Sequence, residues 1–407
     1  MLNLHSCCKG AVSLALALPP LFLGADEASC AFLGDVLKPF ASVSETYDSN
    51  VFRVEDSGQL AALLGDDQMS DFSTIFTIGT ALRYTVSHQS FEAMLKRDFI
   101  RFSHYTQEDA DRDEVSGKAN LSLLQKWTLK LDGGYTSAPE PRTEYTNPQQ
   151  NIRTTYRYGF LAGYQLPIGL TLEAGYRRRE VAYSLETYNV SEYDADIYTG
   201  TITWQISPTA QTYGTYEHDE RTFREGTFVD GETLKRDNTG DSFRIGFNKT
   251  VSPRTSVSTY LGYLSRRHDD FPERDFSGVI AALEGSYGLT YKTRLLIGGE
   301  RQIYEETYTD WIYSVTNTFS LGVNYQVTEK VKATALERLM WKDYEALPES
   351  SAPNRSDFIN ETSAGVEWAP INRLTLNLDY TYSSRDSDIE GFDFTDHTVT
   401  ASVAYRY

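Results

Sequence analysis

Two short groups of residues in this sequence have the chemical types that hydrolysis requires. His88 and Ser90 have the H-x-S spacing of a base and a nucleophile, and the pairs His218-Asp219 and Asp269-Asp270 could hold an attacking water between them. His88 falls in a predicted turn, however, and the segments that contain the other pairs are rich in acids throughout. Because spacing without a structural context is weak evidence for a site, we predict no catalytic residue.

Signals for a metal or cofactor site are no stronger. A run of acids offers oxygen ligands for Ca²⁺ or a bridge to lipopolysaccharide, but a solvated loop explains the same composition: Asp109, Asp111, Asp113 and Glu114. The sequence contains no zinc-ligand spacing, no P-loop and no GxGxxG motif after a strand. We therefore predict no metal and no cofactor. The net charge of −19 argues against a nucleic-acid partner.

The elements around these groups are predicted to be strands, because apolar and polar residues alternate with a period of two. In the segment 374–382, for example, one parity carries leucine and tyrosine and the other carries polar residues. Short breaks recur about every 40 residues, near His88, Lys126, Pro167, Pro208, Pro253, Lys292, Glu329 and Pro370. Longer acidic stretches lie between them. Alternating short and long connections are typical of a transmembrane antiparallel up-and-down β-barrel, with short periplasmic turns and longer extracellular loops.

We predict about 18 strands, within a range of roughly 16–20, in this all-β barrel. The first strand is expected from Phe40 to Arg53 and the last from Phe394 to Tyr407. An even number of strands places both termini on the periplasmic side of the bacterial outer membrane. The terminal aromatic strand resembles the strand that the barrel-assembly machinery recognises, which makes that machinery an expected partner beside outer-membrane lipid and lipopolysaccharide.

The first 31 residues have the features of an export signal. Lys9 precedes the apolar run Ala11 to Leu23, and small residues follow it, so that cleavage is expected after Ala31 or after Ala25. Residues 32–407 would then form one outer-membrane barrel domain.

Strand parity places one set of charged side chains on the polar face, which would line the lumen of such a barrel. The candidates are Arg83, Lys130, Arg157, Arg177, Arg179, Arg244, Arg338, Asp379, Arg385 and Arg406. This set is mainly basic in an acidic chain, so the acidic excess must lie in loops and rims. A positive wall would lower the electrostatic barrier for an anionic cargo. Alternatively, these charges pair across strands and only keep the lumen hydrated.

The opening strand carries a more specific pattern. The run Tyr47-Asp48-Ser49-Asn50-Val51-Phe52-Arg53 follows Lys38-Pro39, and a later segment from Tyr198 to Thr209 is followed by Arg221. This pattern resembles the β-barrel porins encoded in exopolysaccharide operons, above all the exosortase-B-associated polysaccharide transporter family. The resemblance implies passive export of a nascent polysaccharide, with periplasmic export proteins as candidate partners and no catalytic residues. From the residues alone, Asp48 and Asn50 have a turn-forming role.

Three other functions stay open at this point. The first is a general or solute-specific uptake porin, for which the segment Glu220 to Asp241 is the candidate inward-folded loop. The second is an outer-membrane enzyme built on the histidine and aspartate pairs above. The third is an adhesion barrel without a useful pore.

Overall fold

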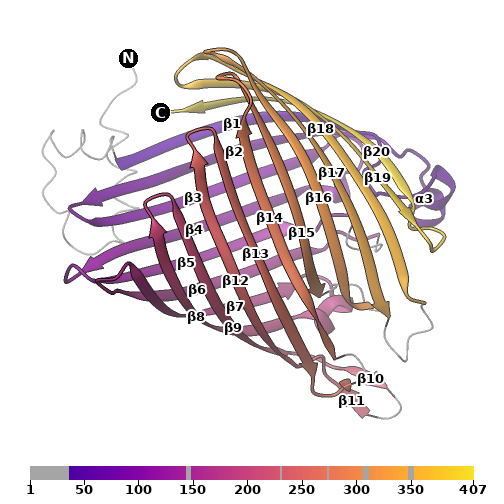
Figure 1. The fold of residues 1–407 in the computed structure, drawn as a ribbon. Coiled ribbons are helices and arrows are strands. Elements are labelled where there is room, and N and C mark those ends of the chain that lie inside the picture. The colour runs from indigo at the N-terminus through magenta and orange to yellow at the C-terminus, as the bar shows by residue number, and fades with distance from the viewer. Residues whose placement is uncertain (1–35, 144–147, 230–231, 273–274, 306–310, 347–352) are drawn as a thin grey trace, which may run out of the picture.

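The chain forms one closed barrel of antiparallel strands. The computed structural model describes residues 36–143, 148–229, 232–272, 275–305, 311–346 and 353–407. In this part of the chain, 18 strands form a single sheet, which closes because β1 pairs with both β2 and β20. Closure leaves no open sheet edge, so that backbone hydrogen bonds are satisfied within the wall, as a membrane requires. Figure 1 shows the strands running obliquely around the barrel.

The strands follow the chain order around the wall. Their bounds are β1 Leu37–Asp48, β2 Asp71–Val86, β3 Gln89–Phe102, β4 Ala110–Leu123, β5 Trp127–Pro139, β6 Ile152–Gln165, β7 Leu170–Tyr183, β8 Tyr193–Ser207, β9 Ala210–Phe223, β12 Asn238–Ser252, β13 Thr255–His268, β14 Phe276–Gly288, β15 Thr293–Glu305, β16 Trp311–Thr328, β17 Val331–Ala346, β18 Arg355–Ile371, β19 Leu374–Ser387 and β20 Phe394–Arg406. The predicted fold class and the predicted count of 18 strands are confirmed.

The alternation in the sequence becomes two different faces of the wall. Along β8, Tyr198 and Trp204 are 47% and 51% exposed, whereas Ala195 and Ile197 on the other parity are 1% and 7% exposed. Every second side chain of a strand points to the same side, so the exposed apolar set forms the outer, lipid-facing surface. No helix among the described residues is long and apolar enough to cross a bilayer.

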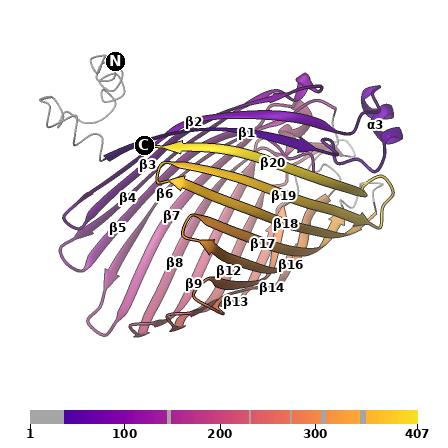
Figure 2. The same ribbon diagram turned by 90° about the horizontal axis from the view of Figure 1, so that it is seen from above.

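The two ends of the barrel differ in their connections. At the end that carries the C-terminus, turns are tight: Ser252 and Thr255 are register partners across a two-residue turn, and so are Thr328 and Val331. The opposite end carries the longer connections, which include helix α3 (Ser57–Leu64), 3-10 helices η1 (Thr106–Glu108) and η2 (Glu186–Ser191), and the small hairpin β10 (Thr227–Val229) and β11 (Glu232–Leu234). Figure 2 shows the C-terminus and α3 at opposite ends.

Two predictions about the N-terminal part need comment. The first strand was predicted to continue to Arg53, which is wrong, because β1 ends at Asp48 and the chain then turns toward α3. The turn arises where the Asp48 carboxylate accepts a hydrogen bond from the backbone N–H of Asn50 (2.8 Å). The predicted export signal, with both cleavage sites, lies outside the described residues.

Candidate pore wall and extracellular mouth

All ten charged candidates lie on the face opposite the exposed apolar side chains, which is the inner face of the barrel wall. Half of them form ion pairs there: Arg83 with Glu92 (3.2 Å), Lys130 with Glu173 (2.9 Å), Arg244 with Glu217 (3.4 Å), Arg338 with Glu361 (3.1 Å) and Arg385 with Asp357 (4.0 Å). These cross-strand pairs neutralise much of the basic excess, as the alternative interpretation of the sequence expected. Asp379 and Arg406 lie toward the periplasmic end of β19 and β20.

Three arginines on the inner face differ from these pairs. Arg157 of β6 stands directly opposite Arg179 of β7, and Arg177 is two residues along β7. Among the described residues, none of the three forms an ion pair with a carboxylate. Like charges placed opposite each other destabilise a sheet, and an anion in the lumen would offset this repulsion. We refer to Arg157, Arg177 and Arg179 as the arginine patch.

Glycines on neighbouring strands leave room for the arginine patch. The side chain of Arg157 lies across Gly134, where an added Cβ would be 3.0 Å from its Nε atom. Arg177 is paired with Gly159, where a Cβ would be 3.0 Å from the Cα of Arg177 and 2.5 Å from the carbonyl oxygen of Tyr176. Strand β6 therefore lies close to both β5 and β7 at this point because Gly134 and Gly159 lack side chains.

The extracellular mouth is narrowed by the connection between β1 and β2. Its anchor is Asn50, which is 1% exposed. The Asn50 amide Nδ2 donates to the carbonyl oxygens of Val54 (2.7 Å) and Thr395 (3.1 Å), and its Oδ1 accepts from the backbone N–H of Val54 (3.1 Å). Arg53 has a φ of 55° and forms ion pairs with Asp48 (2.9 Å) and Asp396 (3.1 Å). These carboxylates raise the pKa of Arg53 against the opposing effect of its burial.

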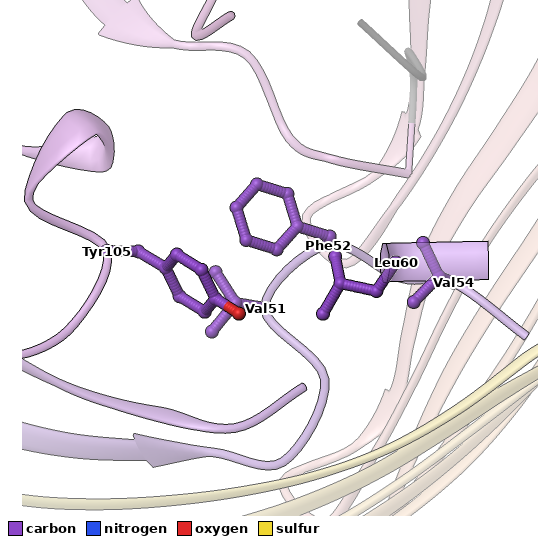
Figure 3. Packing of buried hydrophobic residues seen from close by; sticks show 5 residues of the cluster. All are labelled: Val51, Phe52, Val54, Leu60 and Tyr105. Carbon is purple, nitrogen blue, oxygen red and sulfur yellow. The ribbon is translucent and has the colours of Figure 1, made fainter. Parts of the chain in front are cut away.

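Apolar residues complete this anchor. Val51, Phe52, Val54 and Leu60 pack with Tyr105 from the β3–β4 connection, all at 7% exposure or less. Figure 3 shows the rings of Phe52 and Tyr105 in contact, and their planes are nearly perpendicular at a centroid distance of 4.8 Å. Residues of the Tyr-Asp-Ser-Asn-Val-Phe-Arg run thus hold the β1–β2 connection against the barrel wall.

A second segment, from the β5–β6 connection, reaches the same place. The Arg142 guanidinium lies 4.8 Å from the ring of Phe52 and pairs with the carboxylate of Glu108. Across the barrel, Arg385 of β19 donates to the carbonyl oxygen of Thr143 (3.3 Å). A pocket of about 290 Å³ lies between these segments, lined in part by Phe52, Arg142 and Arg385. The mouth therefore contains a charged constriction.

The predicted inward-folded loop was a different one. The segment Glu220 to Asp241 continues β9 to Phe223, forms the β10–β11 hairpin and enters β12 at Asn238. Figure 1 shows this hairpin at the same end of the barrel as α3, on the opposite side of the opening. The sequence offered one signal for the real constriction, the turn residues Asp48 and Asn50. It offered none for Arg142, whose role depends on contacts with distant strands.

The hydrolytic constellations do not assemble. His218 lies on the outer face, where its Nδ1 contacts Asp241 (2.8 Å), whereas its sequence neighbour Asp219 points inward to Arg221 (2.7 Å). Adjacent strand residues point to opposite faces, so this pair cannot act on one water. Asp270 accepts a hydrogen bond from the backbone N–H of Lys235 (2.7 Å). His88 contacts the Ser87 hydroxyl, while the Ser90 hydroxyl bonds to Asn120, an asparagine partner that the sequence did not reveal.

The acids considered for Ca²⁺ also separate. Asp111 and Asp113 pair with Arg97 on the outer face, whereas Asp109 accepts from the backbone N–H of Phe102. In the described part of the chain, no group of three or more His, Cys, Asp or Glu side chains is arranged to hold a metal ion.

Comparisons with known proteins agree with this architecture. Among solved structures, the chain is similar to the outer membrane protein opdK from Pseudomonas aeruginosa, at 12% identity over 92% of this chain and 99% of that chain, with a TM-score of 0.50. It is also similar to OccK2 (OpdF) of the same organism, at 12% identity over 91% and 98% with a TM-score of 0.52, and to OccK9 (OpdG), at 11% over 92% and 100% with a TM-score of 0.51. Identities this low show a shared fold alone.

No protein with a curated description matches the sequence. The family model described as "Putative beta-barrel porin 2" matches residues 33–407. Together with the outer-membrane barrel fold, this match places the protein in the bacterial outer membrane. Because the matched residues cover nearly the whole chain, the protein belongs to the family of porins described as "Putative beta-barrel porin 2".

Proposed function

We propose that this porin is a passive aqueous conduit for an anionic, hydrophilic cargo, and that the cargo is an extracellular polysaccharide leaving the cell. The arginine patch supports a negative charge on the cargo, because Arg157 and Arg179 stand opposite each other without a carboxylate partner among the described residues. The barrel itself supplies no energy source, so cargo would be driven by synthesis behind it. The ten charged candidates line the proposed path.

The arginine patch favours anions for an electrostatic reason. Fixed charges on a channel wall favour counter-ions within about a Debye length, roughly 8–10 Å at physiological salt, and Arg157 and Arg177 are exposed on the inner face. Three uncompensated guanidinium groups therefore lower the local energy of a carboxylate or phosphate and raise that of a cation. The neighbouring ion pairs, such as Lys130 with Glu173, add water-binding groups without a net charge.

Export of a polysaccharide is supported by the resemblance of the opening strand, Tyr47 to Arg53, to porins of exopolysaccharide operons. Uptake of a small anionic solute is the second candidate, and the mouth favours it. The contacts of Arg142 with Phe52 and of Arg385 with Thr143 narrow the extracellular side, which suits selection of small solutes better than passage of a polymer. For export, these two connections must move aside.

Ion selectivity in planar bilayers tests the shared part of the proposal. In a KCl gradient, the reversal potential of the wild-type porin is expected to have the sign that shows preferential passage of Cl⁻ over K⁺. The triple variant R157Q/R177Q/R179Q should lose this selectivity at unchanged fold, whereas the control R301Q, an outward-facing arginine of β15, should keep it. If the triple variant retains the wild-type reversal potential, the arginine patch does not select the cargo.

A deletion strain separates the two directions of transport. Loss of secreted polysaccharide, restored by the wild-type gene and not by the triple variant, would support export. Normal polysaccharide secretion together with slower growth on an anionic carbon source would instead support uptake.

A further inference from the structure

The outer face of the barrel changes character from one end to the other. Toward the periplasmic end it carries apolar and aromatic side chains, such as Trp127, Trp204, Trp368 and Tyr405, each about half exposed. Toward the extracellular end, outward-facing aromatic side chains such as Phe72, Trp341 and Phe358 are joined by ion-pair networks on other strands. An aromatic girdle alone is expected at both interfaces of a transmembrane barrel, so the charged networks found only toward one end require an explanation.

The network on β3 and β4 is the most compact. Asp111 accepts from Arg97 (2.7 Å) and from Arg101 (3.0 Å), and Asp113 lies 3.6 Å from Arg97. Both guanidinium groups lie over the ring of Phe99, at 5.3 Å and 6.0 Å from its centroid. The two arginine side chains are 48% and 49% exposed, so the network is held in place and still open to a ligand.

Similar networks continue around the wall. Arg178 contacts three carboxylates on β7 and β8: Glu180, Asp194 and Asp196, at 3.0–3.1 Å. Farther along, Asp241 of β12 joins Arg267 of β13 (3.1 Å) to His218 of β9. The charges of both signs therefore form a band on several strands and do not reflect one irregular position.

The location of this band limits what can contact it. Outward-facing groups near the extracellular ends of the strands lie near the outer leaflet, within reach of its headgroups. Contact of these charged side chains with lipid hydrocarbon, without a polar partner, would be unfavourable. A ligand with phosphate groups suits the exposed guanidinium donors, because Arg binds phosphate oxygens through two parallel hydrogen bonds. Carboxylates beside them suit the divalent cations that accompany clustered phosphates.

We propose that Arg97 and Arg101, positioned over Phe99 by Asp111, form a binding site for the phosphate groups of a phosphorylated glycolipid of the outer leaflet. Each guanidinium group keeps N–H donors beyond those used for Asp111, because Arg has five. The lipid's acyl chains would then lie along the apolar side chains below, such as Leu95 and Val115.

Native mass spectrometry of the detergent-solubilised porin with purified bis-phosphorylated lipid A tests this site. The wild type should retain lipid, and R97A/R101A should bind it roughly tenfold or more weakly, because the charge-assisted hydrogen bonds to the phosphates are lost. R97K/R101K keeps the positive charges without the paired N–H donors, so its affinity for the lipid should lie between those of the wild type and R97A/R101A. The matched control K249A removes an outward cation at the periplasmic end and should bind as the wild type does.

Chemically dephosphorylated lipid A separates phosphate recognition from acyl-chain contact. It should bind the wild type as weakly as bis-phosphorylated lipid A binds R97A/R101A. The proposal is overturned if R97A/R101A, shown to be folded by its heat-modifiable migration in gels, binds like the wild type. Equal binding of phosphorylated and dephosphorylated lipid would overturn it as well. A lipid-free dimer that R97A/R101A abolishes would assign the surface to a second copy of the chain instead.

Discussion

Replacing Asn50 with alanine should release the connection that narrows the extracellular mouth. The Asn50 side chain makes three hydrogen bonds inside the wall, two to Val54 and one to the carbonyl oxygen of Thr395. Alanine removes all three and leaves their backbone partners buried without the amide. At about 1 kcal/mol for each bond, the anchored form of this connection loses about 3 kcal/mol.

This loss should stay local. The barrel strands keep their ladders, because Asn50 lies beyond the last register pair of β1 and β20, Asp48 with Thr398, and its side chain makes only one bond to β20, at Thr395. A loss of about 3 kcal/mol raises the population of the released connection by roughly a hundredfold, since 1.4 kcal/mol is a factor of ten. The segment that should respond is α3 together with Val51 and Phe52.

Hydrogen–deuterium exchange measured by mass spectrometry reports this population directly. In N50A, amides of α3, such as that of Leu60, should exchange about a hundred times faster than in the wild type, while peptides from β2 should not change. The matched control is N120A, because Asn120 is exposed on the inner face and its side chain bonds, among the described residues, only to the Ser90 hydroxyl. Single-channel recordings should show a larger or more frequently open conductance for N50A alone. Unchanged exchange in α3 would refute the role given to Asn50.

Three further predictions concern packing and protonation. G159A should lower the unfolding temperature in detergent, at a cost of roughly 1–3 kcal/mol, because its Cβ would be 2.5 Å from a carbonyl oxygen, whereas G200A, with nothing within 4 Å, should not; equal unfolding temperatures would contradict the close approach of β6 and β7. Burial, with nearby carboxylates, raises the pKa of Tyr105 to about 12, above the usual value of about 10. The neutral phenol therefore stabilises the fold fully below pH 10, and this stabilisation is lost as the pH rises toward 12. The difference in absorbance at 295 nm between wild type and Y105F should titrate near pH 12, and a midpoint near pH 10 would show an exposed phenol. R355A should destabilise the extracellular end by roughly 3 kcal/mol, because it leaves the buried Asp357 with only the more distant guanidinium of Arg385, at 4.0 Å, among the described residues. The midpoint of urea unfolding measures this, and an unshifted midpoint would mean that Arg385 or water replaces the lost arginine.

The sequence by itself determined the wall of this protein. Side chains of a strand alternate between two faces, so a period of two in segments such as 374–382 fixes which residues meet lipid and which face inward. For the same reason the inner face could be assigned for Arg157, Arg177 and Arg179 before any coordinates. The short breaks, such as Pro253 and Glu329, set the count of 18 strands because each joins two neighbours in the chain.

Only the tertiary structure decided how these faces are used. Whether an inward charge is neutralised depends on how neighbouring strands are aligned. The alignment brings Lys130 of β5 close to Glu173, two strands away on β7, but places Arg157 of β6 directly opposite Arg179 of β7. The mouth shows the same limit, since Arg142 meets Phe52 and Thr143 meets Arg385 across the barrel. Such contacts join residues far apart in the chain, and a pattern read along one strand holds no information about them.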